Sequence, residues 1–320
     1  MSNKKILVFG AAGFIGTYLI DALRQQGHEV VASDLGNLSA DYYAKLNVDY
    51  VDIDITRQAD FAALGQARFD AVVHLAACQP ANVHSSKYDP RDYINVNVIG
   101  TLNVLEFCRS SGTGKIIHAT SHRNTQGLWA TGRVISERDG RGLKFDGEYA
   151  MFSISESAAQ DCVTHYQAQH GLQGILFRLP PVYGYGPHTE IFKDGAPIKT
   201  GFQVFIEKAR ACEPLEIWGN TEIGRDIIYV KDVVAAFIKA INSTTAHGLY
   251  NITSGQSLSL RAQAQAIAKL FWGASTPPVI VECPEKPNGM DAFLYDISKA
   301  QQELGWSPAY SFEDMLLDYQ

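Results

Sequence analysis

Three glycines near the start of the chain have the spacing of a phosphate-binding loop. They lie in the segment GAAGFIG, residues 10–16, which follows a predicted strand over 4–9 and precedes a predicted helix over 17–26. Glycines allow a tight turn and a close approach of backbone to an anion, and a helix N-terminus offers free N–H groups. The sequence therefore predicts that Gly10, Gly13, Phe14, Ile15 and Gly16 contact the pyrophosphate of a dinucleotide. The alternative is a tight strand–helix turn that binds nothing.

Carboxylates follow the next two predicted strands. Asp34 ends the strand over 29–33, where it can accept hydrogen bonds from both ribose hydroxyls of an adenosine and would repel a 2′-phosphate. The predicted cofactor is therefore NAD rather than NADP, with a strand-end turn as the alternative role of Asp34. Asp54 and Ile55 follow the strand over 49–53, and we expect them to face the adenine. A solvated helix cap is the alternative for Asp54.

Short apolar runs alternate with amphipathic stretches through the first half of the chain. They predict strands over 4–9, 29–33, 49–53, 71–75, 115–120 and 174–178, and helices over 17–26, 91–110 and 153–170. This alternation predicts an α/β fold with a doubly wound parallel sheet of the Rossmann type. Prolines and glycines crowd the span after Arg178, which indicates a change to a smaller C-terminal α/β lobe.

These patterns predict two domains. We expect an NAD-binding domain over 1–178 with about 226–245, and a substrate-binding lobe over 179–225 and 246–320. A ligand would lie between them, over the carboxyl ends of the strands.

Composition limits the kinds of partner. The net charge is −7 and the isoelectric point about 5.7, which disfavours nucleic acid or an anionic membrane as the main partner. The five cysteines are widely spaced with no CxxC pair, which argues against a disulfide framework or a metal site and favours a cytoplasmic location. No apolar run reaches the length of about 18 residues that a membrane span needs. We therefore expect a small-molecule substrate and no metal.

An ordered series of motifs runs through most of the chain. They are the glycine loop with Asp34, VVHLAA (72–77), NVIGT (97–101), RLPPVYG (178–184), RDIIYV (225–230), YNI (250–252), DISK (296–299) and LGWSP (304–308). In these motifs the sequence resembles the extended short-chain dehydrogenase/reductase family, in its branch of sugar-nucleotide epimerases and dehydratases. The resemblance implies an NAD-dependent enzyme that acts on a nucleotide sugar or a related polar substrate.

The resemblance also implies roles for individual residues. Leu75, Ala76 and Ala77 would line the cofactor, and Asn97 would support the active-site helix. Arg225 would meet the pyrophosphate of the nucleotide sugar, because a guanidinium fork suits such an anion. A surface ion pair is the alternative for Arg225. Members of the family often form homodimers through the helices that correspond to 91–110 and 153–170.

The resemblance breaks at the residues that do the chemistry. The family uses a Ser or Thr, which Ser121 matches, and a Tyr and Lys spaced as YxxxK. That Tyr exchanges a proton, and the Lys lowers its pKa. The matching positions here are Phe152, which cannot exchange a proton, and Glu156, which has the opposite charge to Lys. Tyr149 is the one nearby phenol, and no lysine accompanies it.

Several residues are candidates for the missing roles. His122 follows Ser121 and titrates near neutral pH, so it is a candidate acid/base; the alternative is a loop histidine bonded to backbone. His122 and Arg123 replace the Asp-Glu pair of the 4,6-dehydratases, which argues against that reaction. Cys78 is either a small buried apolar residue or a residue that faces the cleft. Ser121, Tyr183 and Arg225 are the predicted substrate contacts, and His84 is a further polar candidate.

Two functions remain open at this point. The first is an NAD-dependent epimerase/dehydratase-like oxidoreductase with an atypical acid/base. The second is an NAD-binding sensor or partner protein that kept the cofactor site and lost the chemistry, as the joint loss of Tyr and Lys suggests. A reductase or lyase with a substrate outside the sugars is not separated from the first by sequence.

Overall fold

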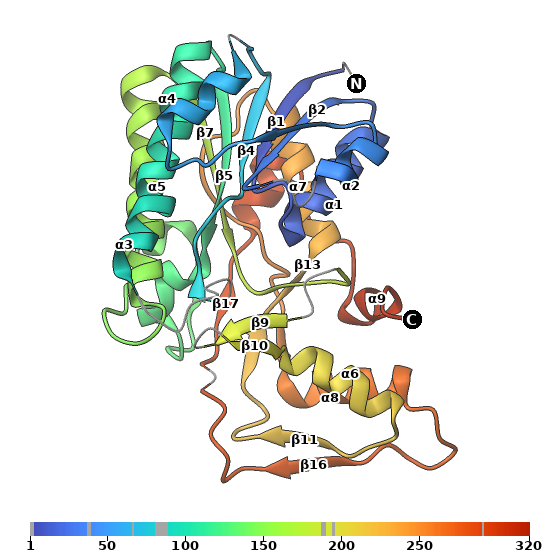
Figure 1. Ribbon diagram of the computed structural model, residues 1–320. Coiled ribbons are helices and arrows are strands. Elements are labelled where there is room, and N and C mark those ends of the chain that lie inside the picture. Colours follow the sequence, from blue (N-terminus) through green and yellow to red (C-terminus); the bar gives the residue numbers. More distant parts are fainter. Residues whose placement is uncertain are drawn as a thin grey trace.

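A parallel sheet of seven strands runs through the larger part of the molecule (Figure 1). The computed structural model describes residues 3–36, 40–65, 67–80, 89–186, 190–193, 196–289 and 291–320. The strands are β1 (Lys5–Phe9), β2 (Glu29–Asp34), β3 (Asp49–Asp52), β4 (Ala71–His74), β5 (Lys115–Ser121), β7 (Gln173–Leu179) and β14 (Gly248–Asn251). Their order is β14-β7-β5-β4-β1-β2-β3, and every pairing is parallel. The predicted doubly wound sheet is confirmed.

Helices cover both faces of this sheet (Figure 1). One face carries α1 (Phe14–Gln25), α2 (Ala40–Lys45) and α7 (Val230–Asn242), and the other carries α3 (Pro90–Tyr93), α4 (Thr101–Ser111) and α5 (Ala150–His170). Strand β1 shows why two layers are needed. Ile6 and Val8 pack in the cluster with α1 and α7, whereas Leu7 and Phe9 pack in the cluster with α4 and α5. Successive side chains of a strand point to opposite faces, so an all-apolar strand must be covered twice.

Two helical segments differ in detail from the prediction. The predicted helix over 91–110 contains a wider π-type turn at Ile94–Gly100, between α3 and α4. The helix predicted from Thr17 begins at Phe14, directly after Gly13. A 3-10 helix over Gln58–Leu64 precedes β4. Because α1 starts inside the glycine motif, its first backbone N–H groups belong to the loop that was predicted to bind phosphate.

The smaller lobe lies beyond the carboxyl end of the sheet (Figure 1). It contains β9 (Glu190–Lys193), β10 (Ala196–Lys199), α6 (Gly201–Arg210), β11 (Leu215–Trp218), α8 (Leu260–Phe271), β16 (Ile280–Cys283) and α9 (Phe312–Leu317). Short pairs join it to the sheet: β6 (Val134–Ile135) with β17 (Leu294–Tyr295), β8 (Val182–Tyr183) with β13 (Ile228–Tyr229), and β12 (Gly224–Asp226) with β15 (Ser257–Ser259). Two of the predicted substrate contacts, Tyr183 on β8 and Arg225 on β12, lie on these strands.

One segment lies elsewhere than the sequence indicated. Residues 248–251 were assigned to the smaller lobe, but β14 pairs in parallel with Ile175–Arg178 and forms the edge of the main sheet. The other predicted boundaries remain predictions. In the described part of the chain, no helix combines the length and apolar character needed to cross a membrane.

Candidate functional site

The glycine loop is packed too tightly for side chains at two positions. Gly10 has a φ of +78°, and a Cβ there would lie 2.5 Å from the backbone N of Ala76. A Cβ on Gly16 would lie 2.4 Å from the carbonyl oxygen of Gly10. Gly13 precedes the first turn of α1, and no side chain caps that turn. The free N–H groups and the positive end of the helix dipole therefore suit the pyrophosphate of NAD.

Asp34 is held at the edge of this loop by two backbone donors. Its Oδ2 accepts a hydrogen bond from the N–H of Ala12 at 2.8 Å, and its Oδ1 accepts one from the N–H of Leu35 at 2.8 Å. Each carboxylate oxygen keeps a further acceptor position for a ribose hydroxyl. The residues present therefore fit the adenosine ribose of NAD and would disfavour a 2′-phosphate.

The other predicted cofactor residues differ in what surrounds them. Leu75 and Ala76 follow β4, and their backbone lies directly against Gly10, with Ala77 next in the chain. Asp54 turns its Oδ1 to Thr56, accepting hydrogen bonds from its backbone N–H at 2.9 Å and its hydroxyl at 2.7 Å. Asp54 thus closes a local turn, whereas the N-cap of the following 3-10 helix is Arg57, so Asp54 is not the helix cap that was its alternative. Ile55 is buried in the core, so the placement of this pair beside the adenine remains a prediction.

Asn97 ties the segment after β4 to helix α5. Its Oδ1 accepts a hydrogen bond from the N–H of Cys78 at 2.7 Å, and its Nδ2 donates to the Cys78 carbonyl and to Ser155 Oγ, each at 2.9 Å. The amide thus supports the helix, as the resemblance implied. Burial raises the pKa of the Cys78 thiol to about 11, so this cysteine is protonated at neutral pH and is a poor nucleophile.

A buried carboxyl group stands where the family has its lysine. Glu156 is 2 % exposed and shares a hydrogen bond with the Thr120 hydroxyl, which also accepts one from Asn124 Nδ2 at 3.1 Å. Burial raises the pKa of Glu156 to about 8, and the bond from Thr120 opposes that rise. Oε1 of Glu156 has no hydrogen-bond partner among the described residues. Glu156 is therefore mostly uncharged at neutral pH, next to the buried ring of Phe152.

His122 is enclosed rather than presented to a substrate. Its ring stacks on Trp129 with centroids 5.1 Å apart and lies 5.2 Å from Phe293. Burial lowers the pKa of His122 well below its ordinary value, although a hydrogen bond with the backbone of Leu179 opposes this. The imidazole is therefore neutral at physiological pH and faces aromatic rings. This placement agrees with the alternative of a loop histidine bonded to backbone and argues against His122 as the acid/base.

The remaining candidates converge at the carboxyl end of β5. The Arg123 guanidinium carbon lies 3.8 Å from the centre of the Tyr149 ring, and the Arg123 N–H donates to Ser121 Oγ at 3.1 Å. Arg225, on β12, lies within electrostatic reach of Tyr149 and Tyr183. Its Nε is buried without a hydrogen-bond partner among the described residues. Ser121, Tyr149, Tyr183 and Arg225 thus form one group, whereas His84 lies outside the described residues.

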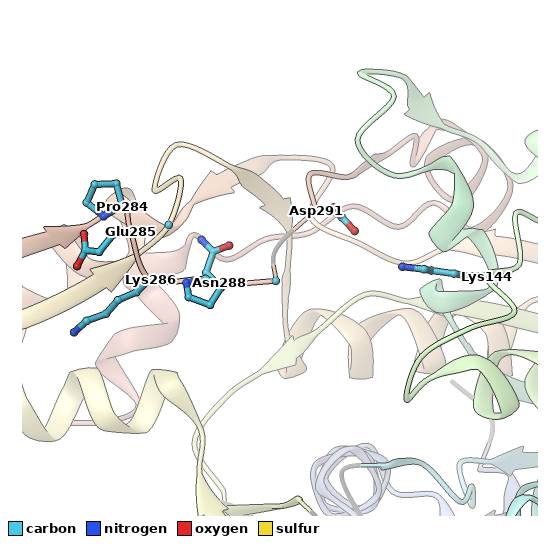
Figure 2. A pocket seen from close by; sticks show the side chains of 9 residues that line it. Lys144, Pro284, Glu285, Lys286, Asn288 and Asp291 are labelled. Atoms are coloured by element: carbon cyan, nitrogen blue, oxygen red, sulfur yellow. The ribbon is translucent and has the colours of Figure 1, made fainter.

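A hollow of about 520 Å³ lies between the segment before α5 and the segment after β16, and none of the four residues of that group lines it (Figure 2). Lys144 reaches into it from the segment before α5, and Asp291, which is within electrostatic reach of Arg225, faces it from the segment after β16. Its walls are Lys144, Gly219, Pro284, Glu285, Lys286, Pro287, Asn288, Gly289 and Asp291. Nowhere in the described ranges do three metal-ligating side chains gather.

Sequence reasoning gave no specific role to two residues of this site. Thr120 was taken only as the end of a strand, yet its hydroxyl is the partner of Glu156. Arg123 was named without a role, yet its guanidinium stacks on Tyr149. Its position two residues after Ser121, where dehydratases of the family have a carboxylate, was the available signal.

Replacing Glu156 by glutamine keeps its shape and removes its titration. The folded pKa of about 8 lies above the value of about 4.3 for an unfolded glutamate, so the carboxyl group stabilises the folded state less and less as the pH rises through about 8. As the pH rises from 6 to 9, we expect the free energy of unfolding of Glu156→Gln to increase relative to that of the wild type by roughly 2 to 3 kcal/mol. Denaturant unfolding of both chains at the two pH values measures this. The same pH dependence in both chains would contradict it.

Known proteins resemble the chain over nearly its whole length. A UDP-glucose 4-epimerase of Mycolicibacterium smegmatis is 28 % identical over 314 residues, which cover 95 % of this chain and 93 % of the relative. UDP-glucuronic acid decarboxylase 6 of Arabidopsis thaliana is 26 % identical, over 98 % of this chain and 87 % of the relative. The crystal structure of a UDP-glucose 4-epimerase from Thermotoga maritima with UDP-glucose superposes with a TM-score of 0.79 at 25 % identity, covering 98 % and 96 % of the two chains.

A family model also matches the chain over most of its length. A model of the NAD dependent epimerase/dehydratase family matches residues 6–253, which include the glycine loop, Asp34, Asn97, Ser121, Tyr149 and Arg225. The family depends on NAD, in agreement with the predicted cofactor. The chain belongs to the NAD dependent epimerase/dehydratase family.

Proposed function

We propose that the protein is an NAD-dependent enzyme that rearranges the sugar of a nucleotide sugar, with Tyr149 as the group that exchanges the proton. The observation that carries this proposal is the convergence of Ser121, Tyr149 and Arg225 at the carboxyl end of the sheet that holds the glycine loop. The relatives that act on UDP-sugars support the substrate class.

Tyr149 is the described phenol closest to the usual catalytic position. Its ring centroid lies 6.4 Å from that of Phe152, which occupies the family's tyrosine position one turn further along the helix. Phe152 has no proton to exchange, and His122 is enclosed in aromatic rings. Bound NAD supplies a hydride acceptor. Ser121 would bond to the reacting sugar hydroxyl, Tyr149 would take its proton, and Arg225 would hold the diphosphate.

Removing the Tyr149 hydroxyl tests this assignment. We expect Tyr149→Phe to lower kcat roughly 10²- to 10⁴-fold, the usual contribution of a positioned acid/base, and to leave the Kd for the nucleotide sugar nearly unchanged. Steady-state kinetics and calorimetry with UDP-glucose measure the two quantities. Tyr185→Phe is the matched control, because Tyr185 is 56 % exposed and its hydroxyl has no assigned role. Full activity of Tyr149→Phe would show that another group moves the proton.

Asp34 determines which cofactor is bound in this proposal. Asp34→Ala removes both acceptors for the ribose hydroxyls, so we expect the affinity for NAD to fall by roughly 10-fold or more. The same change removes the charge that repels a 2′-phosphate, so the preference for NAD over NADP should shrink. Calorimetric titration of wild type and variant with both cofactors measures this. Equal affinities of the wild type for NAD and NADP would contradict the assignment.

A binding protein without turnover is the second candidate, and Glu156 is the observation that favours it. A buried carboxyl group that is mostly uncharged at neutral pH cannot supply the positive charge of the family's lysine. Under this candidate, purified protein would bind NAD and a UDP-sugar but convert none of them. Turnover that depends on Tyr149 would exclude it.

We also propose that the protein is a cytoplasmic homodimer. Helices α4 and α5 lie side by side on one face of the sheet, in the positions through which family members often pair (Figure 1). Five free cysteines in the described residues agree with a reducing compartment. Light scattering after size exclusion should give twice the chain mass of 35.2 kDa. A particle of single-chain mass at micromolar concentration would contradict the dimer.

A further inference from the structure

Two arginines meet at the site although no carboxylate pairs with either. The positive charge of Arg225 acts on Arg123, and both guanidiniums are within electrostatic reach of Tyr149. Neither forms an ion pair with any residue that the structure describes. Glu148 is within electrostatic reach of Arg123, and Asp291 of Arg225, but neither carboxylate is in contact. Both guanidiniums therefore have a carboxylate nearby but none in contact among the described residues.

Burial makes two guanidiniums without a contacting anion costly. It lowers the pKa of both guanidiniums, although an arginine keeps its proton at any physiological pH. Two like charges that are partly withdrawn from water destabilise the protein unless an anion joins them. The diphosphate of a nucleotide sugar would neutralise Arg225, as proposed above. Arg123 would still have no anion in contact.

The surroundings of Arg123 favour a planar anion. Its guanidinium carbon lies 3.8 Å from the centre of the Tyr149 ring and 5.1 Å from that of Trp129. Stacking on aromatic faces fixes the plane of the guanidinium and leaves its N–H donors free along the edge. A fixed edge of this kind matches the two oxygens of a carboxylate in a bidentate pair.

The position of Arg123 indicates which end of the substrate it meets. Its backbone N–H donates to Ser121 Oγ, and its side chain covers Tyr149, so it lies with the two groups assigned to the reacting sugar. Arg225 belongs to β12, which pairs with β15 at the joint with the smaller lobe. The two guanidiniums thus come from different elements.

We infer that the site takes a nucleotide sugar whose sugar ring carries a carboxylate, and that Arg123 binds that carboxylate. This inference rests on the proposed function for the substrate class and adds the acidic group. Arg123 acts as the residue that distinguishes an acidic sugar from its neutral counterpart.

The test uses two ligands that differ only at C6 of the sugar. UDP-glucuronate and UDP-glucose are titrated calorimetrically into the NAD-loaded wild type, and we expect UDP-glucuronate to bind roughly 10-fold or more tightly. Arg123→Met should lower the affinity for UDP-glucuronate roughly 10- to 100-fold, with a much smaller loss for UDP-glucose. Arg123→Lys keeps the charge but not the fork, so its affinity for UDP-glucuronate should lie between the two.

Controls separate this inference from general effects. Arg133→Met removes a positive charge from an arginine that is already paired with Asp139, so it should leave both affinities unchanged. NAD binding shows that each variant is folded. Equal loss of both UDP-sugars in Arg123→Met would place Arg123 on the diphosphate and overturn the inference. Equal affinities in the wild type, unchanged in the variant, would overturn it as well but leave the proposed function intact. Binding of NAD without either UDP-sugar would overturn the proposed function itself.

Discussion

The lack of room for a Cβ atom at Gly10 and Gly16 sets the geometry on which the cofactor site depends. Backbone atoms of Ala76 and Gly10 fill the places where those side chains would be. Because the chain turns this closely, α1 can begin at Phe14, and the end of β4 lies against the loop. The same turn brings the Ala12 N–H to the carboxylate of Asp34 on the neighbouring strand. One steric constraint thus positions the helix N-terminus and the ribose-binding carboxylate together.

At the position of the family's Tyr–Lys pair, the sign of the charge differs from what the family has. Where an ammonium group is usual, the chain has a carboxyl group whose burial favours the uncharged form. The positive charge lies instead on Arg123 and Arg225, which come from the end of β5 and from β12. The position of the family's lysine is thus mostly uncharged at neutral pH, and the positive charge near Tyr149 belongs to these two arginines.

The fold could be predicted because its signals are local. Apolar runs, helix periodicity and glycine spacing each act within a few residues, and they identified the sheet and the glycine loop. The edge strand β14 was missed because a short strand that follows a long insertion has no local mark of its partner. The helix start at Phe14 was misplaced because glycines in the motif do not resemble a helix.

The site was less predictable because its properties arise from distant contacts. From the sequence His122 could be an acid/base or a loop histidine bonded to backbone, and the choice depends on Phe293, which lies far away in the sequence and packs against its ring. The pKa of Glu156 depends on complete burial and on Thr120, which sequence periodicity does not pair with it. The stacking of Arg123 needs Tyr149 from a different element. Residue types identified the candidates, but only the packing distinguishes those that are enclosed from those that face a ligand.

The aromatic cluster around His122 also affects how the two parts of the molecule hold together. Tyr295 shares a hydrogen bond of 2.7 Å with Thr125 and accepts one of 3.1 Å from Trp129 Nε1, while β17 pairs with β6. These contacts join the loop after β5 to the C-terminal segment through buried rings. A hinge through this point would expose the rings to water. The cluster therefore couples the two segments, so that the C-terminal segment and the loop after β5 should unfold together in one cooperative transition.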